Sequence, residues 1–308
     1  MLTTEDLRQR PPSFRSLTGL TVAQFEQLYQ EVAVRYAAAE AARLSRPQRQ
    51  RAPGAGRKFR RPLEDRLLMA LLWLRLYPTY EALGVVLGFD KSTICRRLQF
   101  MLPLLRVVTT VDLSWPDEQQ RPRDWGAILQ DFPDLEVLVD ATEQRIRRPK
   151  STPEQDTQRA YYSGKKQKHA LKTQITIAPD GRILEVSASV PGATSDLTLL
   201  RETQTPARVT GGLMCDAGYQ GLAHDYPEKL LYQAHRASRG HPLTEQQRAE
   251  NRRLSHYRIK IEHVLAQLKV FQVLAQVYRH RRGAYNGYFR LAAALTNRRA
   301  GFLPLQAS

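Results

Sequence analysis

Two aspartates, Asp140 and Asp216, each follow directly on a short apolar run, residues 135–139 and 209–215, that is typical of a buried strand. A rigid strand aims a carboxylate at a fixed point. Carboxylates held close together repel one another unless cations lie between them, and hard oxygen ligands favour Mg²⁺ or Mn²⁺. The pair therefore predicts a metal site. Two such ions, about 3.5 to 4 Å apart in two-metal enzymes, can activate a water or a 3′-hydroxyl for in-line displacement at phosphorus.

A third carboxylate, Glu262, lies where the sequence has the periodicity of an amphipathic helix over residues 254–277. Arg258 stands four residues before Glu262 and Lys269 seven residues after it, so the three share one edge of that helix. Glu262 can then face the metal ions while the two cations contact phosphates. The alternative is a ladder of salt bridges on a solvated helix face, where such spacings are frequent.

The composition limits the class of protein. With 308 residues and 42% hydrophobic content the chain can bury a sizeable core, and we expect one small and one medium domain. The 47 Lys and Arg against 30 Asp and Glu give a net charge of +17, which indicates a partner with many phosphates, above all a nucleic acid. The longest apolar run, residues 67–74, is too short to span a bilayer, and residues 1–10 lack the apolar centre of a signal peptide. We therefore expect no membrane partner and a location inside the cell.

Residues 1–112 are expected to form an all-α domain, with helices over 16–44, 63–77 and 79–87 and a last helix for which both Asp90 and Ser92 suit the N-cap. A short helix, a turn at Gly88 and a basic helix describe a helix-turn-helix over about 63–105. Such a unit places the start of its second helix in the major groove of DNA. The residues expected to contact DNA there are Lys91, Ser92, Thr93, Arg96 and Arg97. The alternative is a helical bundle with a solvated basic face.

Residues 113–134 contain three prolines and are expected to be a linker to a second domain, residues 135–308. The arginine-rich segment 43–61 is either a solvated linker or a contact to the DNA backbone. In the second domain we expect a strand at 135–139, a hairpin of 168–178 and 182–190, a helical turn at 196–202, a strand at 209–215 and the helix at 254–277. This order predicts an α/β sheet enzyme.

Lysines and tyrosines gather shortly after the first aspartate, between residues 161 and 172. We expect Lys165 and Lys166 to contact phosphates, and the alternative is a solvated hairpin edge guarded by lysines. His169 and His263 are expected to be structural, because two-metal phosphoryl transfer does not need a general base. Glu143 is expected to order a nearby arginine or to lie on the surface.

Five short motifs together resemble the DDE transposases, over about residues 60–300. They are Val-Asp-Ala-Thr-Glu at 139–143, Tyr-Ser-Gly-Lys-Lys at 162–166, Pro-Gly-Ala-Thr-Ser-Asp at 191–196, Asp-Ala-Gly-Tyr-Gln-Gly at 216–221 and Arg-Ile-Lys-Ile-Glu-His at 258–263. The similarity is to the bacterial insertion-sequence group related to eukaryotic Harbinger elements. It implies an RNase H-like mixed sheet flanked by helices, preceded by the helix-turn-helix domain.

The resemblance also implies roles for particular residues. Asp140, Asp216 and Glu262 match the family's catalytic and metal-binding places, while Arg258 and Lys269 match its flanking cations. Asp196 belongs to a family motif too and is the rival second carboxylate. It follows a Gly-Ala-Thr-Ser loop and can simply cap a helix, whereas Asp216 ends an apolar strand, so Asp216 is preferred.

The function implied by the resemblance is a transposase with two Mg²⁺ or Mn²⁺ ions, which cleaves DNA at element ends and joins the strands to target DNA. Its partners would be double-stranded DNA, both terminal inverted repeats and target, and a second copy of the chain, since two ends must be held together. The alternatives are a domesticated nuclease and a catalytically inactive, sequence-specific DNA-binding protein. We expect a location in the bacterial cytoplasm, associated with the nucleoid, or in the nucleus of a eukaryotic host.

Overall fold

The computed structural model describes residues 1–45, 61–115, 130–151 and 157–302. Most of the arginine-rich segment and most of the expected linker therefore lie outside the described residues. The chain forms two compact units. The helical unit comprises residues 1–112, 270–273 and 290–304, and the sheet unit comprises 113–269, 274–289 and 305–308.

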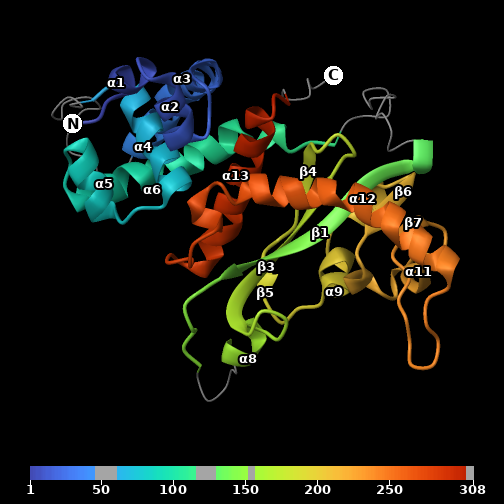
Figure 1. Ribbon diagram of the computed structural model, residues 1–308. Helices are drawn as coiled ribbons and strands as arrows, with labels where there is room; N and C mark the ends of the chain where they lie inside the picture. Colours follow the sequence, from blue (N-terminus) through green and yellow to red (C-terminus); the bar gives the residue numbers. More distant parts are fainter. Residues whose placement is uncertain (46–60, 116–129, 152–156, 303–308) are drawn as a thin grey trace. The chain divides into compact units, whose positions relative to one another are not determined.

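The helical unit is built from six N-terminal helices, which Figure 1 shows from blue to cyan-green. They are α1 (Thr4–Arg8), α2 (Pro11–Thr18), α3 (Val22–Leu44), α4 (Leu63–Leu76), α5 (Tyr80–Leu87) and α6 (Lys91–Val108), followed by the short 3-10 helix η1 (Thr110–Asp112). The single helix expected over 16–44 is wrong. It is divided because Gly19, with φ 84°, ends α2 and a capping box between Thr21 and Gln24 starts α3.

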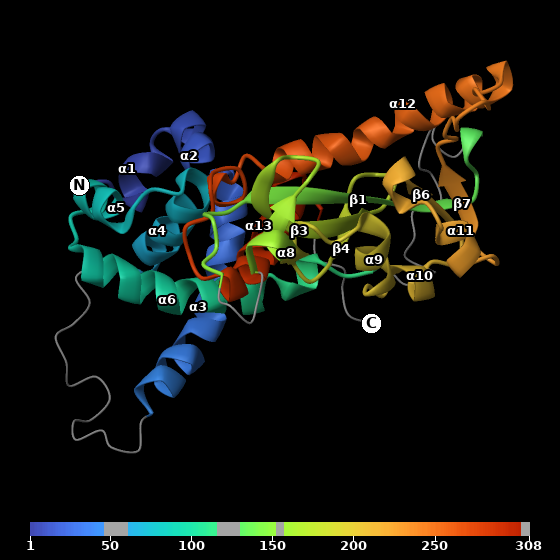
Figure 2. The ribbon, with the colours of Figure 1, turned by 90° about the horizontal axis from the view of Figure 1, so that it is seen from below.

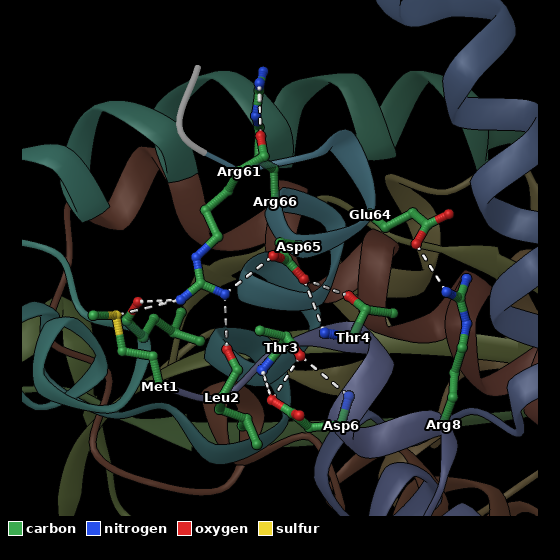
Figure 3. Close-up of polar contacts among 11 residues, drawn as sticks. Met1, Leu2, Thr3, Thr4, Asp6, Arg8, Arg61, Glu64, Asp65 and Arg66 are labelled. Atoms are coloured by element: carbon green, nitrogen blue, oxygen red, sulfur yellow. Dashed lines mark hydrogen bonds and ion pairs between the residues drawn. The ribbon is translucent and has the colours of Figure 1, made fainter. Parts of the chain in front are cut away.

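Helix α4 is buried along most of its length, and its first turn is tied to the start of the chain (Figure 3). Asp65 Oδ1 accepts hydrogen bonds from the backbone N–H and the hydroxyl of Thr4, both at 2.9 Å. The other oxygen of Asp65 pairs with Arg61 Nη1 at 3.1 Å, and Arg61 also donates to the carbonyl oxygens of Leu2 and Leu87. One arginine thereby joins the N-terminal segment to the end of α5.

The helix, turn and basic helix expected after residue 79 are confirmed as α5, Gly88 and α6. Gly88 has φ 71°, a left-handed conformation that glycine adopts without the strain a side chain would bring. Asp90 takes the N-cap position of α6, and its carboxylate accepts from the hydroxyls of Ser92 and Thr93 at 2.7 and 3.1 Å. Helix α6 continues through Pro103 to Val108.

The sheet unit contains a mixed sheet, which confirms the α/β class and agrees with an RNase H-like fold. The strands among the described residues are β1 (Leu135–Arg145), β2 (Tyr162–Ser163), β3 (Lys168–Ile177), β4 (Ile183–Val186), β5 (Val190–Pro191), β6 (Gly212–Cys215) and β7 (Leu230–Gln233). The main order is β2-β3-β1-β6-β7, with β4 and β5 also paired to β3. The pairs with β3 are antiparallel, while β1, β6 and β7 run parallel to one another.

Helices flank this sheet on both faces, with α12 on one side and α9 and α10 on the other in Figure 2. The helices described after β1 are α8 (Thr157–Tyr161), α9 (Asp196–Arg201), α10 (Thr205–Arg208), α11 (Leu222–Asp225), α12 (Glu245–Leu268) and α13 (Tyr285–Arg299), of which α13 belongs largely to the helical unit, and the 3-10 turns are η3 (Ala217–Tyr219), η4 (Gln272–Leu274) and η5 (Arg282–Ala284). On the α9 face, Val137 and Val139 of β1 pack with Leu200 and Tyr219. Because successive side chains in a strand alternate, Asp140 points to the other face, toward α12.

Two expected elements differ most from the structure in their bounds. The strand expected to end at residue 139 continues to Arg145, because β3 pairs with it as far as Arg145 and Ala170. Helix α12 starts at Glu245 rather than 254, after a capping box between Thr244 and Gln247, and it ends at Leu268 rather than 277. Its first turns are polar and show no apolar stripe, so periodicity did not reveal them. None of the described helices is long and apolar enough to cross a membrane.

Candidate active site

Asp140 lies in the interior of the central strand, between β3 and β6. Its side chain is 18% exposed, and Oδ1 accepts a hydrogen bond of 2.8 Å from the backbone N–H of Ala141. The pKa of Asp140 is raised to about 6, chiefly by burial, and the negative charges of Asp216 and Asp196 contribute to the increase. The Ala141 hydrogen bond and the Arg258 charge act in the opposite direction. An aspartate so placed holds its negative charge at a cost, which a nearby cation would offset.

Asp216 is brought beside Asp140 by strand pairing. Strands β1 and β6 are parallel, with Leu138 opposite Met214. Asp140 and Asp216 each follow two residues later, so the same register places them side by side. Asp216 is the first residue after β6, and its Oδ1 accepts a hydrogen bond of 2.7 Å from the N–H of Gly218. The sheet therefore aligns two carboxylates that are 76 positions apart in the sequence.

Glu262 and Arg258 come to the same place from α12. This helix buries one stripe, including Ile261 and Leu265, and leaves Glu262 exposed beside it. Arg258 Nη2 lies 4.0 Å from Asp140 Oδ2. The spacing of four residues thus places one cation and one carboxylate of the same helix edge toward β1.

A cavity of about 610 Å³ contains all the site residues that the sequence predicted in this unit. Five carboxylates among the described residues line it, namely Asp140, Glu143, Asp196, Asp216 and Glu262. Five cations line it as well, namely Lys165, Lys166, Lys172, Arg258 and Lys269. Burial lowers the pKa of Lys269, and the positive charge of Lys166 contributes to the same direction. Acidic and basic groups are therefore gathered at one opening of the sheet unit.

Lys172 is a member of this cavity that sequence reasoning did not place in the site. Its side chain is only 10% exposed, and Nζ lies 2.8 Å from Asp196 Oδ1, 2.6 Å from the carbonyl oxygen of Thr194 and 3.8 Å from Glu143 Oε1. Lys172 and the two carboxylates thus form a buried ion-pair network rather than a surface contact. The available signal was a lysine within the otherwise buried run of β3. Asp196 is thus already paired with a cation of the protein itself.

Gly218 sets how closely the two candidate second carboxylates approach. A Cβ at this position would lie 2.8 Å from Asp196 Oδ2 and 2.8 Å from Asp216 Oδ1. Real Cβ atoms do not come so near to other heavy atoms, so a side chain here would displace both carboxylates. The glycine of the Asp-Ala-Gly-Tyr motif therefore lets both acidic groups lie against this turn.

The donors of this cavity fit a hard divalent cation, since they are carboxylate oxygens. Glu143 Oε2 is buried and has no hydrogen-bond partner among the described residues, and the pKa of Asp140 is raised by burial and, to a lesser degree, by the neighbouring carboxylates. In the part of the chain that the structure describes, no three His, Cys, Asp or Glu side chains stand close enough together to hold an ion as they are placed. Asp140 and Asp216 are aligned by the sheet, whereas Glu262 is exposed and has room to turn.

The five residues predicted to contact DNA lie in the first turns of α6, in the helical unit. Lys91, Ser92 and Arg96 are exposed, and Thr93 is partly covered. Arg97 differs, because its guanidinium lies 4.0 Å above the ring of Phe89 and is only partly exposed. The start of α6 therefore presents a polar and basic surface, with Arg97 held at its side.

Two family models match the chain. Residues 139–297 match the model described as DDE superfamily endonuclease, and residues 62–110 match the one described as helix-turn-helix of DDE superfamily endonuclease. The second match covers α4, α5 and α6, which confirms the expected helix-turn-helix.

Curated relatives agree with these models. A probable transposase for insertion sequence element IS702 of Microchaete diplosiphon is 29% identical over 244 residues, which are 79% of this chain and 82% of that protein. A putative transposase for insertion sequence element IS112 of Streptomyces albus G is 26% identical over 267 residues, 86% of each chain. No solved structure is significantly similar. Because the endonuclease model spans more than half of the sequence and includes both strand aspartates and α12, the chain belongs to the DDE superfamily endonucleases, whose members generally use divalent metal ions.

Proposed function

We propose that this protein is the transposase of an insertion sequence, which cleaves DNA at the ends of its element and joins the 3′-hydroxyls to target DNA. The observation that carries this proposal is the alignment of Asp140 and Asp216 on parallel neighbouring strands, with Glu262 lining the same cavity. The two relatives that are named transposases span most of this chain, which supports the same activity.

Asp140, Asp216 and Glu262 are the residues that we propose hold two Mg²⁺ or Mn²⁺ ions. Such ions supply activation of the attacking oxygen and stabilisation of the leaving oxygen. Glu262 must turn toward the two aspartates for this role, and its exposed position on α12 leaves it room to do so. Asp196 remains the rival, but its Oδ1 is paired with Lys172, which favours Asp216.

The cations of the cavity are proposed to bind the DNA backbone. Arg258 and Lys269 lie on α12 and at its end, while Lys165 and Lys166 lie in the turn before β3. Charge-assisted hydrogen bonds from such groups to phosphate oxygens are strong and hold the strand in position for an in-line attack. The low pKa of Lys269 favours an anionic ligand, because a phosphate would stabilise its charged form.

DNA recognition is assigned to the helical unit. Lys91, Ser92 and Arg96 are exposed at the start of α6, where a helix-turn-helix contacts the major groove. Terminal inverted repeats would be the specific ligand, and target DNA a second one. Since two element ends must be held together, we propose that at least a dimer assembles on DNA.

The test is a cleavage assay on DNA that carries the terminal repeats, in the presence of Mg²⁺. Asp140→Asn, Asp216→Asn and Glu262→Gln should each abolish nicking and leave DNA binding intact. Glu245→Gln, which changes an exposed carboxylate at the start of α12, is the matched control and should cleave normally. Normal nicking by both Asp140→Asn and Glu262→Gln would refute the assignment.

The same assay separates the second aspartate from its rival and tests the alternative functions. If Asp196→Asn rather than Asp216→Asn abolishes metal-dependent nicking while the fold is retained, the assignment of Asp216 is wrong. Binding to the repeats without any cleavage by the unaltered protein would instead support a catalytically silent DNA-binding protein.

A further inference from the structure

A second pocket, of about 270 Å³, lies within the helical unit between α3, α4 and α6. Four arginines and one glutamate supply its charged lining. The full lining is Tyr36, Glu40, Arg43, Arg66, Thr93, Arg96, Arg97, Phe100 and Met101. None of these residues lines the cavity of the proposed nuclease site. The pocket is therefore a feature that DNA cleavage does not account for.

The charges of this pocket are unbalanced. Glu40, the acidic residue of the lining, is taken by Arg43, whose Nε lies 2.9 Å from Glu40 Oε2. Arg96 and Arg97 add further positive charge around the same opening, and among the described residues of the lining no second carboxylate accompanies them.

Arg97 is the group that most needs a partner. Its Nη1 is buried and has no hydrogen-bond partner among the described residues. Burial lowers the pKa of Arg97, and the positive charges of Arg66 and Arg61 lower it further. A buried cationic donor beside other cations is costly to leave unpaired, and an anion would remove that cost.

Aromatic rings hold two of these arginines in place, Tyr36 in the lining of the pocket and Phe89 outside it. Arg97 stacks over Phe89, and Arg66 donates to the hydroxyl of Tyr36 while its guanidinium lies 5.5 Å from that ring. Tyr36 and Phe100 meet edge to face at 5.7 Å. Aromatic stacking leaves the edges of a guanidinium free to donate, which is the geometry that binds tetrahedral oxyanions.

We propose that this pocket is a phosphate-binding site of the helical unit, in which Arg97 donates to one phosphoryl group and Arg96 and the Thr93 hydroxyl complete the contacts. The phosphoryl group has two possible sources, a phosphodiester of DNA that lies along α6 or free phosphate. The first source rests on the DNA binding proposed above, and the second does not.

Binding of inorganic phosphate to the full chain is measured first, by calorimetry and by the shift of the thermal unfolding midpoint at constant ionic strength with chloride as reference. Phosphate should bind to the unaltered protein and raise its midpoint. Arg97→Met should weaken binding at least about tenfold, because a hydrogen bond to a charged group is lost. Arg106→Met is the matched control, an exposed arginine of α6 outside the pocket, and should bind normally.

A second variant guards against a folding defect of Arg97→Met. Thr93→Asp places a carboxylate at the pocket in the first turn of α6, a position that helices tolerate well. It should abolish phosphate binding, and its unfolding midpoint in chloride should fall only slightly, because the lost hydrogen bond to Asp90 is exposed to solvent. Equal phosphate affinity in the unaltered protein and both pocket variants, or no phosphate binding at all, would overturn the proposal.

The source is then identified from the salt dependence of binding to duplex DNA. If a DNA phosphate occupies the pocket, Arg97→Met should reduce the slope of log K against log salt by about 0.9, the value for one lost phosphate contact. If the slope is unchanged while phosphate binding is lost, the site takes free phosphate. Neither measurement needs strand cleavage, so an inactive nuclease leaves both outcomes readable.

Discussion

Asp140→Asn should stabilise the metal-free protein. Burial and the carboxylates of Asp216 and Asp196 raise the pKa of Asp140 from 3.8 to about 6, so its charged form is disfavoured in the folded state. At about 1.36 kcal/mol for each pH unit, the difference corresponds to about 3 kcal/mol, and the side chain is buried enough for this figure to apply. Asparagine keeps the size of the residue and its acceptor for the Ala141 N–H, and it removes the charge.

The sign of the effect depends on pH. Because the folded-state pKa is the higher one, the folded protein binds the extra proton between about pH 6 and pH 4, and the stability of the unaltered protein rises as pH falls through that window. The advantage of Asp140→Asn should therefore be full above pH 6 and vanish near pH 4.

Urea unfolding in EDTA at pH 7.5, 6, 5 and 4 measures this difference directly. At pH 7.5 the variant should be more stable by about 3 kcal/mol, while Glu202→Gln, which alters an exposed carboxylate, should show no such gain. Added Mg²⁺ should stabilise the unaltered protein more than the variant, because only the former keeps the charged ligand. An Asp140→Asn protein that is equally or less stable in EDTA at every pH would refute the reasoning.

Three further substitutions test other contacts. Lys172→Met should lower the free energy of unfolding in urea by about 3 to 5 kcal/mol, because it leaves the Asp196 carboxylate without its buried cation. Adding Asp196→Asn to this variant should restore most of the lost stability, whereas losses of the two substitutions that simply add would contradict the pairing. Arg298→Met should also lower the free energy of unfolding by about 3 to 5 kcal/mol, because the fully buried carboxylate of Asp112 loses its partner, the Arg298 guanidinium. A loss below about 1 kcal/mol would argue against this ion pair. Gly218→Ala should slow cleavage at least about tenfold with DNA binding unchanged, and a normal single-turnover rate would show that the carboxylates need no such packing.

The sequence was informative wherever local pattern decides structure. The turn at Gly88, the basic helix after it and the apolar run before Asp216 all depend on neighbouring residues, and the structure has α5, α6 and β6 at those places. The spacing of Arg258 and Glu262 likewise indicated a shared helix edge, and both residues line the cavity. Periodicity and capping express short-range geometry, so a single sequence suffices for them.

Other features depend on partners distant in the chain, and the sequence alone did not give them. Asp140 lies inside β1 rather than at its end, because β3 supplies hydrogen bonds beyond it. Lys172 seemed one of several basic residues of a hairpin, and only the fold brings Asp196 and Glu143 to it. The stacking of the Arg97 guanidinium on Phe89 was also not evident from the sequence.

The pairing of Arg298 with Asp112 and Glu31 has a consequence for synthesis of the protein. A ribosome makes the first two hundred and ninety or so residues before the guanidinium that completes the helical unit exists. A product of premature termination that ends after α6 would retain the buried acidic group of Asp112 and lack its counterion. We expect such a fragment to be less stable than the same segment of the finished polypeptide.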